Sequence, residues 1–358
     1  MLLTTVSPWQ AVPLGKTSRV RFGALVGPGL NGLEGDPMTS KAMKRIGNLY
    51  ERICSLKNLQ EADTRAQRGK GNRYGVTLHN RNRESNLLVL QDQLITGTFR
   101  TSPYQVFTVH EPKERTVYRL PYYPDRIVHH AIMNVLEPIF VANFTRDTYS
   151  CLKTRGIHGC LKRIRRDLRD VAGTRFCLKL DIQKFYPSID HDVLKGLLRR
   201  KFKDPQLLEL LDEIIDSAPG LPIGNYLSQY LSNFFLSYFD HWLKEKKGVR
   251  YYYRYADDLV LLHSNSDFLR SLLEDIRLYL EGLKLRVKDN YQVFPVEARG
   301  IDFIGYVCYH THVRIRKSIK QSFARKLARN PNHASTASYM GWLGHADARH
   351  LERKLLHA

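Results

Sequence analysis

A short hairpin with two aspartates at its turn constrains this chain more than any other feature of its sequence. Tyr251–Tyr255 and Leu259–Leu262 are apolar segments of strand length, and Ala256-Asp257-Asp258 lies between them. This pattern predicts two strands of a buried sheet joined by a tight turn. Aspartate is also common in solvated turns, so the pair alone does not separate a structural turn from a catalytic one.

A third aspartate follows another apolar segment. Phe176–Leu180 predicts a buried strand that ends on Asp181. If this strand lies beside the hairpin in one sheet, three carboxylates meet, and they repel one another unless cations neutralise them. Mg²⁺ takes carboxylate, water and phosphate oxygens as ligands, and two such ions can activate a 3′-hydroxyl and stabilise a leaving pyrophosphate. We therefore expect Asp181, Asp257 and Asp258 to be catalytic and, with Ile182, to hold two Mg²⁺ ions that Mn²⁺ can replace.

The charge of the chain indicates a polyanionic partner. Its 56 Lys and Arg exceed its 35 Asp and Glu, which gives a net charge of +21. Clustered cations favour phosphate binding. The candidates for nucleic-acid binding in the two most basic clusters are Arg163, Arg165, Arg166, Lys317 and Lys320. For either cluster the alternative is a solvated helix face or a surface for an acidic partner.

Composition predicts a folded, soluble protein. With 43% hydrophobic and 25% charged residues, the 358-residue chain has an ordinary globular composition. Its five cysteines form no close pairs, which suits a reducing cytosol. We find no apolar run of membrane-spanning length and no signal peptide, so we expect a cytoplasmic protein without a membrane partner.

The spacing of apolar residues predicts alternating helices and strands. Residues 1–41 lack periodicity and indicate a disordered arm. A first helix is expected from about Ala42, then a polar and basic stretch over Lys57–Arg83, and a second helix around Leu87–Leu94. Further helices are expected over 193–202, 207–215, Tyr226–Lys246 and Asp267–Glu281, the last with Ser266 as its N-cap.

Five segments resemble the motifs of reverse transcriptases, in the order in which that family has them. They are Glu111–Arg115 and Asp125–Val128 (fingers), Leu180–Tyr186 (first catalytic aspartate), Tyr255–Asp258 (the YxDD signature) and Gly300–Tyr306 (primer grip). The resemblance covers roughly Ala42 to His345. It implies an α+β right-hand polymerase fold with N-terminal helices and fingers over 42–175, a palm with an antiparallel sheet over 176–306, and a small helical thumb over 307–358.

The resemblance also implies roles for residues around the carboxylates. Lys113 and Arg115 would hold the incoming triphosphate, with Arg119 as the alternative because the spacing to the next motif is one residue longer than expected. Lys288 would contact or protonate the leaving pyrophosphate, unless it is a solvated loop lysine. Tyr186 would be a steric gate that excludes the 2′-hydroxyl of a ribonucleotide, unless it is a core aromatic. The implied primer grip comprises Phe303, Gly305 and Tyr306.

One segment distinguishes between kinds of reverse transcriptase. Where retroviral and group II intron enzymes have Pro-Gln-Gly, this chain has Pro-Ile223-Gly224, followed by Ser228-Gln229. This segment resembles the reverse transcriptases of diversity-generating retroelements. Ile223, Gly224 and Gln229 would then lie at the nucleotide site, and Ile223 would lower fidelity opposite template adenine, unless it only packs the palm.

That subtype implies an error-prone, adenine-mutagenic polymerase that copies a template-repeat RNA into cDNA. Its implied partners are the structured template RNA, the cDNA/RNA duplex, dNTPs and a basic accessory variability protein. The alternatives are a reverse transcriptase of a retron or phage-defence system and a catalytically silent RNA-binding protein with a polymerase fold. The Ile-Gly and Ser-Gln pairs disfavour the first alternative, and the three carboxylates disfavour the second.

Overall fold

A four-stranded antiparallel sheet forms the centre of the computed structural model, which describes residues 45–110, 114–153, 155–329 and 333–356. Its strands are β3 (Phe176–Asp181), β4 (Tyr251–Tyr255), β5 (Asp258–His263) and β6 (Gln292–Pro295), in the order β4-β5-β3-β6. The strands predicted from three apolar segments are therefore confirmed. The arm expected over residues 1–41 lies outside the described residues.

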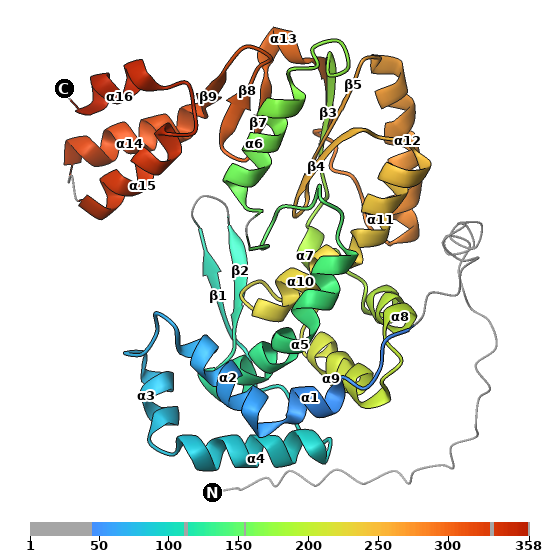
Figure 1. Cartoon of the computed structure of the whole chain (residues 1–358), viewed down its shortest axis with the longest axis vertical. Coiled ribbons are helices and arrows are strands. Elements are labelled where there is room, and N and C mark those ends of the chain that lie inside the picture. Colours follow the sequence, from blue (N-terminus) through green and yellow to red (C-terminus); the bar gives the residue numbers. More distant parts are fainter. Residues whose placement is uncertain (1–44, 111–113, 154, 330–332, 357–358) are drawn as a thin grey trace, which may run out of the picture.

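Alternating side chains give this sheet two buried faces. Leu178 and Leu180 of β3 belong to the larger apolar core, whereas Cys177 belongs to a second core that includes α6 (Ile157–Asp167). Figure 1 shows α12 (Ser266–Gly282) on one side of the sheet and α6 on the other. Because side chains alternate along a strand, Lys179 and Asp181 share the face of Cys177.

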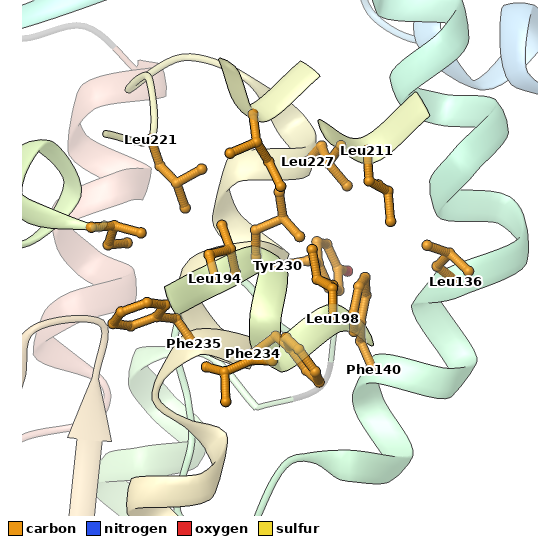
Figure 2. Close-up of a cluster of buried hydrophobic side chains, with 14 of the residues drawn as sticks. Leu136, Phe140, Leu194, Leu198, Leu211, Leu221, Leu227, Tyr230, Phe234 and Phe235 are labelled. Atoms are coloured by element: carbon orange, nitrogen blue, oxygen red, sulfur yellow. The ribbon is translucent and has the colours of Figure 1, made fainter. Parts of the chain in front are cut away.

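The larger core joins the sheet to a group of helices. These are α5 (Ile127–Asn143), α7 (Phe185–Ser188), α8 (His191–Lys201), α9 (Pro205–Asp216), α10 (Tyr226–Phe235), α11 (Ser237–His241) and η4 (Trp242–Lys246). Figure 2 shows Phe140, Leu198 and Phe234 meeting in this core from α5, α8 and α10. Each fully buried side chain of this size contributes about 1.5–3 kcal/mol. This packing fixes α10 against α5 and α8.

The prediction of one continuous helix over Tyr226–Lys246 is wrong. Three consecutive helical segments cover these residues, and α10 ends at Phe235. The Ser237 hydroxyl donates a hydrogen bond to the Phe234 carbonyl (2.7 Å) and so competes with the backbone hydrogen bonds of the helix. The N-cap predicted for α12 is also wrong by one residue, because Asn265 accepts hydrogen bonds from the Asp267 and Phe268 amides.

The N-terminal part contains more helix than predicted. In chain order its elements are α1 (Tyr50–Cys54), α2 (Leu56–Gln67), α3 (Tyr74–Asn80), α4 (Arg83–Ile95), the hairpin β1 (Gln105–Val109) and β2 (Arg115–Arg119), and η3 (Tyr122–Arg126). The polar stretch Lys57–Arg83 thus holds two helices. Ala42 lies outside the described residues, and within them the first helix begins at Tyr50, where Asp204 accepts hydrogen bonds from the Leu49 and Tyr50 amides (2.9 and 3.0 Å).

The C-terminal part, where the structure describes it, combines a small three-stranded sheet with four helices. Its elements are α13 (Val296–Arg299), β7 (Ile301–Phe303), β8 (Tyr306–Cys308), β9 (Val313–Ile315), α14 (Lys317–Arg329), α15 (His333–Leu343) and α16 (Arg349–Leu356). Helices α14–α16 lie at one end of the molecule and α1–α4 at the other (Figure 1). The predicted α+β architecture with an antiparallel sheet and a small helical C-terminal unit is confirmed. Within the described part of the chain, no helix is both long and apolar enough to span a membrane.

Candidate active site

The three predicted carboxylate residues meet at one end of the central sheet. Asp181, the last residue of β3, pairs across the strands with Asp258, the first residue of β5. Asp257 lies in the turn between β4 and β5, and its carbonyl accepts a hydrogen bond from the Ile182 amide (3.1 Å). The buried faces of the strands fix this register, since a slip of one residue would exchange the two faces.

The turn that carries Asp257 has an unusual backbone conformation. Tyr255 pairs with Asp258, so only Ala256 and Asp257 connect the strands. Ala256 has a positive φ of 56°, as tight hairpin connections require. A left-handed conformation costs about 1–2 kcal/mol for a residue with a Cβ, so neighbouring groups must hold this turn in place.

Burial and neighbouring charge perturb the carboxylates. Burial first, and then the adjacent Asp181 carboxylate, raise the pKa of Asp257 to about 6. Lys288 Nζ lies 3.5 Å from Asp181 Oδ2, and the Lys288 amide donates to the Asp181 carbonyl (2.8 Å). The structure therefore places Lys288 beside a predicted catalytic carboxylate.

The crowded carboxylates suit a divalent cation. A positive charge beside Asp257 would favour its ionised form, and carboxylate oxygens are ligands that Mg²⁺ prefers. The Ile182 side chain is a hydrocarbon, so the backbone carbonyl is the oxygen that this residue could offer to a metal ion. Within the described ranges, no three His, Cys, Asp or Glu side chains form a ready-made metal cluster. The two-metal site therefore stays a prediction, for which the residues present are chemically suited.

Tyr186 lies close to this carboxylate group. It is half-buried in α7, and its hydroxyl is hydrogen-bonded to the Ser232 hydroxyl of α10 (3.2 Å). Burial raises the pKa of Tyr186, with a smaller contribution from Asp257. The Tyr186 carbonyl also accepts from the Leu221 amide (2.9 Å), which anchors the segment that leads to Ile223.

The segment containing Ile223 and Gly224 packs against the β1–β2 hairpin. The Tyr118 amide of β2 donates to the Ile223 carbonyl (2.9 Å). Gly224 has a φ of +119°, and a Cβ there would lie 2.6 Å from the Tyr118 carbonyl oxygen. Glycine is therefore required by this close approach. Gln229 lies half-buried on α10, where its carbonyl accepts from the Ser232 hydroxyl (3.0 Å).

The predicted triphosphate-binding residues lie on the same hairpin. Arg115 and Arg119 are exposed at the two ends of β2, and alternation places them on the face of Val117. The Val117 side chain lies against Gly224. Both arginines thus share the face directed at the Ile223 segment, and Lys113 lies outside the described residues.

The predicted primer-grip residues form the β7–β8 hairpin. Phe303 and Tyr306 are buried, and Ile304 and Gly305 connect them with positive φ values of 47° and 89°. A Cβ on Gly305 would lie 2.5 Å from the Trp342 ring, and the Tyr306 hydroxyl donates to the Trp342 carbonyl (3.1 Å). The hairpin therefore attaches the end of α15 to the sheet region.

The predicted basic residues occupy two different places. Lys317 and Lys320 line a hollow of about 910 Å³ together with Lys179, which shares its face of β3 with Asp181. Arg163 and Arg166 lie on α6 and pair with Asp167 (2.7 and 2.9 Å), while Arg165 lies 3.5 Å from Asp347. The hollow thus extends along the carboxylate face of the sheet toward the C-terminal helices.

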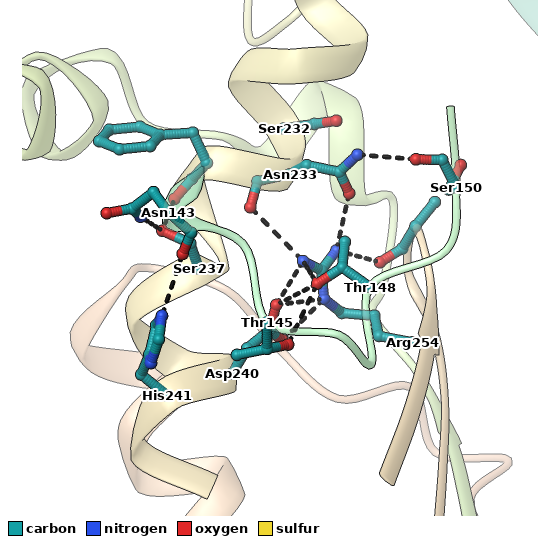
Figure 3. A network of polar contacts seen from close by, with 12 residues as sticks. Asn143, Thr145, Thr148, Ser150, Ser232, Asn233, Ser237, Asp240, His241 and Arg254 are labelled. Carbon is teal, nitrogen blue, oxygen red and sulfur yellow. Dashed lines mark hydrogen bonds and ion pairs between the residues drawn. The ribbon is translucent and has the colours of Figure 1, made fainter. Parts of the chain in front are cut away.

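A polar network that was not predicted from the sequence lies behind the turn that carries Asp257. Arg254 of β4 is fully buried and bonds to Asp240, Asn233 and Thr148 (Figure 3). An arginine inside the apolar strand Tyr251–Tyr255 was the available signal. Its partners are too far away in sequence to be identified from spacing.

Comparisons with known proteins agree with this arrangement. The family model described as reverse transcriptase (RNA-dependent DNA polymerase) matches residues 111–308, more than half of the chain. Protein YkfC of Escherichia coli (strain K12) is 26% identical over 296 residues, which cover 68% of this chain and 77% of YkfC. The group II intron-encoded protein LtrA of Lactococcus lactis subsp. cremoris is 24% identical over 177 residues, which cover 46% of this chain and 29% of LtrA.

Solved structures of similar shape include apo telomerase from Candida tropicalis truncated from its C-terminal domain. The TM-score is 0.46 at 14% identity, over 63% of this chain and 59% of that chain. The chain spans about three quarters of YkfC but less than a third of LtrA. Because the family model matches more than half of its length, the chain belongs to the reverse transcriptase family of RNA-dependent DNA polymerases.

Proposed function

We propose that this reverse transcriptase copies the template-repeat RNA of a diversity-generating retroelement into error-prone cDNA. The observation that carries the catalytic part is the cross-strand pairing of Asp181 with Asp258 and the position of Asp257 in the turn beside them. Two Mg²⁺ ions held there would supply the charge that activates a primer 3′-hydroxyl and stabilises the leaving pyrophosphate. Mn²⁺ would substitute for Mg²⁺.

The remaining residues would bind and orient the reactants. Arg115 or Arg119 would hold the triphosphate from the β1–β2 hairpin, with Lys113 as the further candidate in the adjoining segment. Lys288, 3.5 Å from Asp181, would balance charge on the pyrophosphate side. Tyr186, whose ring is held by Ser232, would lie beneath the sugar and exclude a 2′-hydroxyl.

We assign the template–cDNA duplex to the hollow lined by Lys179, Lys317 and Lys320. In this proposal residues 42–175 form the N-terminal helices and fingers, 176–306 the palm, and 307–358 the thumb. Phosphate contacts from lysines would hold the duplex regardless of sequence, as a polymerase requires. Phe303, Gly305 and Tyr306 would support the primer strand through the β7–β8 hairpin, and Arg163, Arg165 and Arg166 would contact structured RNA.

Purified protein with an RNA template, a primer and dNTPs tests the catalytic proposal. Extension should require Mg²⁺ or Mn²⁺, and Asp181→Asn or Asp257→Asn should abolish it while leaving RNA binding intact. Each substitution removes a ligand charge but little volume. Appreciable synthesis by either variant would remove that residue from the catalytic role.

The retroelement subtype rests on the Ile223 segment. A glutamine beside the nascent base pair can hydrogen-bond to it, whereas isoleucine offers only apolar contact, so a misaligned pair leaves no polar group unpaired there. A loss of about 1.4 kcal/mol of discrimination raises error roughly tenfold. The hydrogen bond from the Tyr118 amide to the Ile223 carbonyl supports a position of Ile223 beside the hairpin that we propose binds the nucleotide.

Misincorporation opposite template adenine tests this part of the proposal. Ile223→Gln should lower it, and Ile223→Leu, which keeps an apolar side chain of similar size, should not. Equal error spectra for wild type and Ile223→Gln at matched extension would move the source of infidelity elsewhere. Sequencing the DNA that flanks the gene separates the subtype from a retron or phage-defence enzyme, because only the former has a template repeat, a variable gene and an accessory variability protein.

A further inference from the structure

A fully buried ion pair lies directly behind the proposed catalytic turn. The Arg254 guanidinium and the Asp240 carboxylate have no exposed side-chain surface, and Nη2 lies 2.6 Å from Oδ2. Asp240 also accepts hydrogen bonds from the Thr148 hydroxyl (2.9 Å) and the Tyr252 hydroxyl (2.7 Å). Figure 3 shows Arg254 reaching from β4 to α10, α11 and the Thr148 segment.

Stability alone does not account for this pair. Burying two charges costs several kcal/mol per ion before pairing, and apolar residues of similar volume often stabilise a core equally well. The informative feature is what the remaining guanidinium donors contact. Arg254 Nη1 donates to the Ala256 carbonyl (3.1 Å) and to Asn233 Oδ1 (3.0 Å).

The first of these bonds fixes the backbone that carries Asp257. The Ala256 carbonyl belongs to the peptide before Asp257, and Ala256 is the residue with the left-handed φ of 56°. The Asp257 carbonyl, in the peptide after it, accepts from the Ile182 amide (3.1 Å). Both peptides that flank the Asp257 Cα are therefore held, which fixes the direction of its Cα–Cβ bond and so the position from which its carboxylate extends.

The second bond connects the same arginine to the proposed sugar gate. Asn233 is buried on α10, and its Nδ2 donates to the Ser150 carbonyl (2.9 Å). The preceding residue, Ser232, is hydrogen-bonded to the Tyr186 hydroxyl (3.2 Å). Two adjacent residues of α10 are therefore hydrogen-bonded to Arg254, which holds the peptide before Asp257, and to the Tyr186 hydroxyl.

We propose that Arg254 and Asn233 are positioning residues that set the geometry of Asp257 toward the metal ions and the placement of Tyr186 toward the sugar. Arginine is needed because its planar fork reaches Asp240, Asn233 and the Ala256 carbonyl at once, which a lysine ammonium cannot do from the same site. This inference rests on the proposed function, because it assigns its consequences to metal binding and sugar selection.

The test compares Arg254→Lys and Asn233→Ala with a matched control, Asn58→Ala. Asn58 bonds to the Ile53 and Ala131 carbonyls between α2 and α5, so its loss removes similar hydrogen bonds far from the turn. The first readout is Mn²⁺ affinity without substrates, measured by electron paramagnetic resonance. The second is the ratio of deoxyribonucleotide to ribonucleotide incorporation.

We expect about tenfold weaker Mn²⁺ binding by Arg254→Lys and Asn233→Ala, as is usual when groups that orient metal ligands are removed. Sugar discrimination by Asn233→Ala should fall about threefold or more, since small misplacements of a positioning group have large kinetic effects. Asn58→Ala should keep wild-type values. Simple destabilisation lowers the folded fraction, which circular dichroism measures, but leaves the metal affinity and the incorporation ratio of the folded molecules unchanged.

Wild-type Mn²⁺ affinity and sugar discrimination in folded Asn233→Ala would overturn the proposal, and so would an equal shift in the Asn58→Ala control. If Arg254→Lys does not fold, Asn233→Ala decides the question. Failure of the proposed function itself is recognised separately, because Asp181→Asn or Asp257→Asn would then extend a primer. If the aspartate variants are inactive while Arg254→Lys and Asn233→Ala keep wild-type Mn²⁺ affinity and sugar discrimination, the positioning role alone is rejected.

Discussion

Replacing Asp257 by asparagine in the metal-free protein tests whether the buried carboxylate of the β4–β5 turn lowers the stability of the fold. Burial, and then the Asp181 carboxylate, raise the pKa of Asp257 from its ordinary value of 3.8 to about 6. One pH unit corresponds to about 1.4 kcal/mol, so ionising this carboxyl in the folded protein costs about 3 kcal/mol. Asparagine has nearly the same size and no charge. We therefore expect Asp257→Asn to raise the free energy of unfolding by about 1–3 kcal/mol at pH 7.5 in EDTA, with the lower part of the range reflecting lost carboxylate hydrogen bonds.

The raised pKa of Asp257 also determines how its effect on stability changes with pH. Because the folded pKa is raised, the folded state holds a proton on Asp257 that the unfolded state releases, so stability from this group is greatest at low pH and falls as pH rises from about 4 to about 6. The difference in free energy of unfolding between Asp257→Asn and wild type should reach its full value at pH 7.5, fall to about half of it at pH 5, and be small at pH 4.

Urea unfolding of both proteins at these pH values measures the gap, with Asp289→Asn as the control because Asp289 is an exposed aspartate. Mn²⁺ should stabilise wild type by about 2.7 kcal/mol at one hundred times its dissociation constant and should stabilise Asp257→Asn much less. An asparagine variant that is no more stable than wild type at pH 7.5, or a gap that does not change with pH, would refute the electrostatic reasoning.

Three further substitutions address the nucleotide site. Tyr186→Ala should raise ribonucleotide incorporation relative to deoxyribonucleotide, whereas Tyr186→Phe should not; unchanged selectivity in an active Ala variant would reject the gate. Gly224→Ala places a Cβ 2.6 Å from the Tyr118 carbonyl oxygen, so we expect a loss of about 1–3 kcal/mol in stability by thermal unfolding and a higher KM for dNTPs; wild-type values for both would contradict the close contact. Lys288→Ala should slow single-turnover extension about tenfold or more without changing primer–template affinity, and an unchanged rate would assign Lys288 to the solvated loop.

The central sheet could be predicted from sequence because its information is local. Continuous apolar runs such as Leu259–Leu262 indicate buried strands, and Asp181 at the end of such a run indicates which end of the sheet carries the carboxylates. The beginning of α1 could not be predicted in this way, because its amides are capped by Asp204, which lies 155 residues away from Leu49. Ile46 likewise forms backbone hydrogen bonds with Lys201 and Lys203 instead of continuing a helix.

The candidate site also has residues that a local sequence pattern identifies and others whose roles depend on contacts with distant residues. Asp257 and Asp258 lie in a recognisable turn, and Tyr186 follows Asp181 at a spacing that resembles the family motif. The support of that turn was missed, because Arg254 is joined to Thr148 across 106 residues and to Asn233 across 21. Single-sequence patterns identify the residues that carry chemistry more readily than those that hold them, since holding depends on contacts that folding creates.

The proposed function predicts that rate and fidelity can be changed separately, by substitutions before and within α10. The carboxylates belong to the β3–β5 pair, whereas Ile223 lies in the segment leading into α10 and is bonded to Tyr118 of the β1–β2 hairpin. If the proposed function is right, replacing Ile223 would alter a contact between this segment and the nucleotide while the strand pairing of Asp181 remains. Ser232 and Asn233 lie further along the helix, where the buried core fixes them, and shifting packed side chains there costs about 1–3 kcal/mol. Substitutions at Ile223 should thus change the error spectrum with little effect on metal affinity, whereas substitutions at Asn233 should change metal affinity and sugar selection together.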